Sequence, residues 1–176
     1  MKEKTRSNFE CEVKYFLKSA KGIIIGIIFG VGLSFCISFL FMLVTQSLAG
    51  GITSLFGERW LYYATIIPFI LAFAILGFYF TKQKSITNKQ LWFLSLITAL
   101  FITLYSGTIG ALFGEYVLRG GSLRTYTEGG YTGVNVEGVI VWGTIYAFIL
   151  LPLTTPLARL ILQMFFEFLK KYKIAT

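Results

Sequence analysis

The sequence contains no histidine and no aspartate, and only 14% of its 176 residues are charged. Histidine is the side chain that most often carries protons at neutral pH and the commonest metal ligand, so its absence argues against most hydrolytic and metal-dependent chemistry. The two cysteines do not suggest a site either. Cys11 lies in a charged N-terminal stretch and Cys36 in a long apolar run, so they form neither a structural disulfide nor a metal-like spacing. We therefore expect no metal, no cofactor and no enzymatic activity.

Apolar residues are what the sequence has in excess: 56% are hydrophobic, and the mean hydropathy is +0.73. A soluble domain has roughly half apolar and about a quarter charged residues. A chain of this length still exposes much of its surface after folding, so one core cannot bury the surplus. Lipid is therefore predicted to be the solvent for most of the chain.

Four apolar stretches are long enough to cross a bilayer, which requires roughly 20 residues of helix. They are residues 22–48, 60–80, 91–113 and 139–162. Only helices and closed barrels satisfy all backbone groups in hydrocarbon, and these stretches lack the alternation of barrel strands. The predicted fold is an all-α integral membrane protein with a four-helix transmembrane domain over residues 22–165.

The basic residues predict the orientation. Of the 16 Lys and Arg, all but Arg59, Arg119 and Arg124 flank the helices on one side. By the positive-inside rule that side is cytoplasmic, which places both termini (residues 1–21 and 166–176) and the loop between the second and third helices inside the cell. Sidedness thus accounts for the net charge of +8 without a nucleic acid, and membrane lipids are the expected contacts. The predicted location is the cell (inner) membrane.

The two cytoplasmic ends are amphipathic. Residues 7–21 predict a short helix that either lies on the inner leaflet or docks a cytosolic partner. Near the other end, Pro152 and Pro156 should kink the fourth helix. Beyond the kink, Arg159 either extends to the headgroups or is a buried functional group. The candidate docking residues are Lys14, Lys18, Arg159, Lys170 and Lys171.

The outer loop, residues 114–138, is the longest predicted connection. Two alternating runs, residues 122–128 and 131–137, flank Gly129-Gly130, a spacing typical of a β-hairpin. The loop either recognises something outside the cell or only covers the helix ends. Its candidate recognition residues are Arg124, Tyr126 and Tyr131.

Small residues recur every four positions in two of the helices. Such ladders let helices approach closely in lipid, where no hydrophobic force drives them together. They predict a helix contact in the same chain or with a second copy. The first ladder is Gly22, Gly26, Gly30, Ser34 and Ser38, and the second is Ser106, Gly110 and Gly114.

A short internal similarity links the ends of the first and third helices. Residues 55–58 and 112–115 both read Leu-Phe-Gly-Glu, which fits a duplicated helix hairpin but is also short enough to arise by chance. If the repeat holds, Glu58 and Glu115 lie at matching depths. They are then either lining groups of an outer vestibule or ordinary interfacial carboxylates.

These features favour a non-catalytic, self-associating bacterial inner-membrane subunit. It would anchor or sense at the membrane and couple to a cytosolic or membrane protein partner, as in an immunity, exclusion or antiviral (phage) defence system. The alternative is an oligomeric pore or small transporter, its path lined by the first and third helices.

Overall fold

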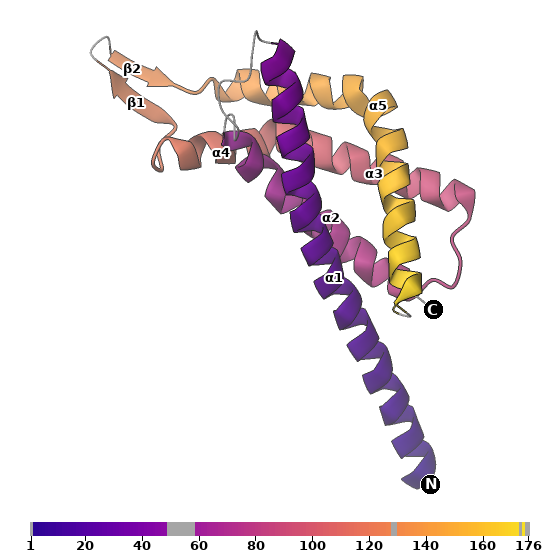
Figure 1. Cartoon of the computed structure of the whole chain (residues 1–176). Coiled ribbons are helices and arrows are strands. Elements are labelled where there is room, and N and C mark those ends of the chain that lie inside the picture. Colours follow the sequence, from indigo (N-terminus) through magenta and orange to yellow (C-terminus); the bar gives the residue numbers. More distant parts are fainter. Residues whose placement is uncertain (1, 49–58, 128–129, 173, 175–176) are drawn as a thin grey trace.

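The structure is a computed structural model, and it describes residues 2–48, 59–127, 130–172 and 174. Its architecture is helical, with four helical segments long and apolar enough to cross a membrane (Figure 1). These segments are Phe16–Val44, Trp60–Thr81, Asn88–Leu118 and Val136–Lys171. The chain is therefore a multi-pass membrane protein.

The first helix, α1 (Lys2–Leu48), has 47 residues and runs without a break (Figure 1). Residues 7–21 were predicted to form a separate short helix. In the structure the same residues continue directly into the span, because no proline or glycine precedes Gly22. At a rise of 1.5 Å per residue α1 is about 70 Å long, roughly twice the thickness of a bilayer core.

The second helix, α2 (Trp60–Thr81), is the best buried of the four. In its most apolar 18-residue stretch 44% of the residues are buried, compared with 22% in α1. Phe69, Phe73 and Phe80 lie on its inner side, and Phe165 of the last helix packs edge-on against Phe73 with ring centroids 5.3 Å apart. This aromatic cluster forms the core at one end of the molecule.

The third span consists of three consecutive pieces: α3 (Asn88–Tyr105), the π-helical turn η1 (Ser106–Gly110) and α4 (Ala111–Leu118). It begins at a capping box in which Thr87 and Gln90 bond reciprocally. The span was predicted to end at Phe113 and instead continues to Leu118. A π turn holds one residue more than an α turn, so it rotates everything that follows it around the helix axis.

The last helix, α5 (Val136–Lys171), begins at Asn135, whose side-chain oxygen accepts from the Gly138 amide at 2.9 Å. It bends sharply midway along its length (Figure 1). Pro152 and Pro156 lie inside it, and each removes one backbone donor, which accounts for the bend. The residues on both sides of the bend remain helical as far as Lys171.

Two short strands, β1 (Arg124–Thr127) and β2 (Gly130–Gly133), pair antiparallel between the third and fourth spans. Tyr126 is the register partner of Tyr131. Gly120 and Gly121, both with positive φ, turn the chain between α4 and this pair. The strands lie at one end of the bundle, and the C-terminus and the connection from α2 to α3 lie at the other (Figure 1).

Candidate functional site

The glycine ladder of α1 lies directly against the backbone of α2. A Cβ atom built on Gly30 would lie 2.7 Å from the carbonyl oxygen of Phe69, and one built on Gly22 would lie 2.7 Å from that of Gly77. Gly26 faces the carbonyl oxygen of Phe73 in the same way. Any side chain at these three positions would push the helices apart, so the contact requires glycine.

The contact between α1 and α2, called the seam below, continues beyond the glycines as a cluster of hydroxyl groups. The Oγ1 of Thr65 in α2 lies 2.8 Å from the Oγ atoms of both Ser34 and Ser38, and all three residues are buried. A hydroxyl that bridges two others satisfies polar groups that lipid could not solvate. Both serines were predicted packing residues, whereas Thr65 was not predicted.

The ladder of the third span divides at η1. Gly110 lies against the carbonyl oxygen of Ala64, and a Cβ on Gly114 would lie 2.5 Å from that of Trp60, so both glycines contact α2. Ser106 does not join them: it borders a cavity, and its Oγ is buried without a hydrogen-bond partner among the described residues.

Gly107, one residue after Ser106, contacts α5 instead of α2. A Cβ on it would lie 3.2 Å from the carbonyl oxygen of Gly143. This glycine pair was not among the predicted packing residues, although a small residue follows each glycine by four positions: Ala111 after Gly107 and Ala147 after Gly143. The α1 ladder, the glycine pair, and Gly110 and Gly114 of the second ladder are thus occupied by contacts within one chain.

A cavity of about 760 Å³ lies between α1, α2, the third span and α5. This volume is within the usual range of small-molecule sites. Its wall is mostly aliphatic and aromatic, with scattered hydroxyl groups. The hydroxyl-bearing residues at its wall other than tyrosine are Ser38, Thr65, Thr98, Thr103, Ser106 and Thr154. Such a wall suits an apolar molecule with few polar atoms and does not suit a hydrated ion.

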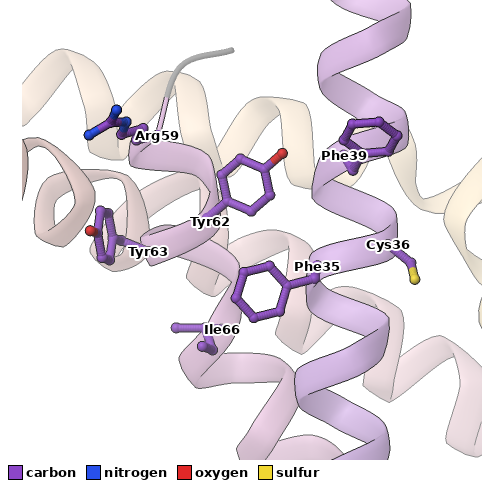
Figure 2. A pocket seen from close by; sticks show the side chains of 7 residues that line it. All are labelled: Phe35, Cys36, Phe39, Arg59, Tyr62, Tyr63 and Ile66. Carbon is purple, nitrogen blue, oxygen red and sulfur yellow. The ribbon is translucent and has the colours of Figure 1, made fainter. Parts of the chain in front are cut away.

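A second hollow, of about 650 Å³, opens between α1 and α2 (Figure 2). The Tyr62 ring fills part of it and lies 5.9 Å from the Phe35 ring, while Arg59 and Tyr63 point away from α1 (Figure 2). The Tyr62 hydroxyl is buried and has no partner among the described residues. The hollow is thus an aromatic crevice between two spans.

The charged candidates lie at the ends of the molecule. Glu115 accepts from Arg119 Nε at 2.9 Å in a surface ion pair. Glu58 lies outside the described residues, so the vestibule pair stays a prediction. The recognition residues lie on the strands: Arg124 and Tyr126 on β1, and Tyr131 on β2.

The candidate docking residues are separated. Lys14 and Lys18 lie on α1, and Lys170 and Lys171 lie in the last turn of α5. Arg159 is half-buried and reaches the start of α3: its Nη2 donates to Asn88 Oδ1 at 2.8 Å, and its guanidinium lies 4.7 Å from the centroid of the Trp92 ring.

Within the described part of the chain, no group of three or more His, Cys, Asp or Glu side chains is close enough to hold a metal. Comparisons with family models, curated proteins and solved structures give no match for this chain.

Proposed function

We propose that the chain is a non-catalytic subunit of the bacterial inner membrane, with both termini in the cytoplasm. It would sense or anchor at the membrane and couple the change that it senses there to a cytosolic partner. The partner-facing part is the N-terminal extension of α1, with six basic residues before Gly22. A role in immunity, exclusion or phage defence is compatible with such a subunit.

The continuity of α1 is the observation that carries this proposal. One unbroken helix contains both the glycine seam against α2 and the charged extension beyond the span. A change in how the seam packs would therefore be passed along the helix to its N-terminal end. A separate surface helix joined by a flexible link would transmit much less.

The cavity is the proposed binding site for the molecule that the subunit would sense. Leu33, Ile37, Ser38 and Phe41 of α1 border it, so an apolar molecule in the cavity would touch the sensing helix directly. Membrane lipids and lipid-soluble compounds are the ligands whose chemistry fits this wall.

Self-association remains part of the proposal, through a different surface from the ladders. In the most apolar 18-residue stretch of α5 only 6% of the residues are buried. Its exposed apolar side chains include Val141, Phe148 and Ile149. That face is available to lipid or to a second copy, and native mass spectrometry of the Phe148→Ala and Ile149→Ala variants against wild type would distinguish the two.

The test uses a photo-crosslinking amino acid at position 14 in the full chain, expressed in bacterial membranes. We expect one discrete adduct with a cytosolic protein, and none from the same probe at Gln83 in the other cytoplasmic connection. Ala99→Phe, which fills the cavity from α3, should change the yield of the position-14 adduct. The matched variant Ile97→Phe, on the exposed face of α3, should not. The proposal would be refuted if the probe at position 14 gave lipid adducts and no protein adduct.

A small transporter is the second candidate, since the cavity borders both α1 and the third span. The wall favours an apolar or amphiphilic cargo over an ion. Uptake of a fluorescent lipid-soluble compound into proteoliposomes, blocked by Ala99→Phe and altered by Glu115→Gln or Glu58→Gln, would favour this alternative. Absence of any flux with wild-type protein would favour the sensor.

A further inference from the structure

Arg159 lies on α5 just after the second proline, opposite the first turns of α3. It contacts Asn88, the first residue of α3, and the ring of Trp92 one turn later. These contacts join positions 71 residues apart in the sequence. They fix the plane and the direction of the guanidinium group.

The charge of Arg159 is not balanced. A guanidinium is always protonated in proteins, and both of its partners here are neutral. In the part of the chain that the structure describes, no carboxylate lies within ion-pair distance of Arg159, and the Arg119–Glu115 ion pair lies at a different site. A cation near hydrocarbon without a counter-charge costs free energy, so an external anion would be stabilising.

Partial burial of the Arg159 side chain makes its uncompensated charge more costly. The Nε atom of Arg159 is buried and has no hydrogen-bond partner among the described residues. The hydroxyl of Thr155, one helical turn earlier, is in the same condition. The guanidinium has therefore lost water on one side without gaining an acceptor, while the Nη2 hydrogen bond to Asn88 lies at the surface.

The depth of the site points to the class of anion. Asn88 follows directly after the connection between α2 and α3, so Arg159 lies level with the end of a span. Tryptophan is enriched at that level of a membrane, where lipid phosphates lie. Lys84 and Lys89, both exposed, lie in and next to the same connection and add positive potential.

We propose that Arg159 binds a phosphate group at this end of the bundle, with Asn88 and Trp92 holding the guanidinium in position. The fork of terminal N–H groups suits two phosphate oxygens, a geometry that lysine cannot reproduce. The phosphate belongs to an anionic lipid headgroup or to a free phosphate ion, which share the same chemistry.

The experiment uses the full chain, purified and delipidated in detergent. Native mass spectrometry measures binding of phosphatidylglycerol, of zwitterionic phosphatidylcholine, and of inorganic phosphate alone. We expect phosphatidylglycerol to bind wild type at least about tenfold more tightly than the Arg159→Gln variant, the size of one lost charged contact. Arg159→Lys should fall between them. Arg119→Gln, which removes a paired arginine elsewhere, should bind like wild type.

Each outcome decides the matter. Loss of phosphatidylglycerol binding in Arg159→Gln, with Arg119→Gln unchanged, supports the site and identifies a lipid as the source. Arginine-dependent binding of inorganic phosphate supports it with the free ion as the source. Equal binding by wild type and Arg159→Gln overturns the proposal and leaves an ordered water as the partner of these donors. Asn88→Ala keeps the charge, and its weaker binding would support the same conclusion if Arg159→Gln failed to fold.

Discussion

Gly110 of η1 lies against the carbonyl oxygen of Ala64 in α2. That oxygen would normally accept from the backbone N–H four residues later, but residue 68 is proline and has none. A carbonyl that has lost its usual helical donor therefore lies against a residue without a side chain. A Cα–H group there can act as a weak donor to the oxygen.

Gly110→Ala should weaken this contact. The added Cβ would meet the Ala64 oxygen on one side and the Tyr105 oxygen, at 3.0 Å, on the other, and neither backbone atom can move freely. We expect a loss of about 1–3 kcal/mol, typical of overpacking. Thermal unfolding in detergent, followed by circular dichroism, measures it. An unchanged midpoint would mean that η1 does not press on α2.

Gly26→Ala and Gly32→Ala form a matched pair within α1. Gly26 faces the carbonyl of Phe73, whereas a Cβ at Gly32 meets nothing within 4 Å. We expect Gly26→Ala to destabilise the protein, because α1 must move away from α2. Gly32→Ala should be neutral or stabilising by up to about 1 kcal/mol, since alanine favours helix. The same unfolding assay compares them, and equal effects would contradict the observed orientation of the ladder.

Thr65→Val removes the hydroxyl shared by Ser34 and Ser38 and keeps the shape of the side chain. We expect a loss of about 0.6–1.7 kcal/mol, which runs from the average to the largest value for side-chain hydrogen bonds between membrane helices. Thr144→Val is the control, because that hydroxyl bonds only to the Ile140 carbonyl of its own helix. Chemical unfolding in mixed micelles can resolve the difference. A larger loss in Thr144→Val would be evidence against the hydroxyl cluster.

The proposed orientation can be tested by cysteine labelling. With Cys36→Ser, Cys11 is the remaining thiol, and we expect a membrane-impermeant maleimide to reach it in inverted vesicles and not in intact spheroplasts. Ser122→Cys, in a chain without native cysteines, should label in the opposite manner because it lies near the strand pair at the other end. Labelling of both positions from one side would exclude the proposed topology.

Composition and run length were sufficient to predict the four apolar helices, because lipid restricts what a chain of this hydropathy can form. The spacing of small residues indicated helix contacts without identifying a partner. Opposite the α1 glycines, α2 presents Gly77 and the backbone carbonyls of Phe69 and Phe73. The sequence does not show that two large residues leave their carbonyls open to the close approach of another helix.

The π turn explains why the ladder predicted for the third span is divided in the structure. Ser106, Gly110 and Gly114 share a face only on a regular α-helix, and the extra residue in η1 turns Ser106 toward the cavity. Nothing in the local sequence predicts a π turn, since it forms where tertiary contacts from α2 and α5 meet the helix. The role of Arg159 was likewise left open, because its partner Asn88 is 71 positions away.

The four-residue period of the α1 ladder also limits how that helix can move. Consecutive small residues of the ladder, its rungs, lie four residues apart, which is about 6 Å along the axis at 1.5 Å per residue. Between rungs, residues with side chains would face the carbonyls of α2, so intermediate positions are sterically costly. Displacement of α1 along α2 is therefore confined to whole steps of one rung, and each step would carry the charged N-terminal end by the same 6 Å or so.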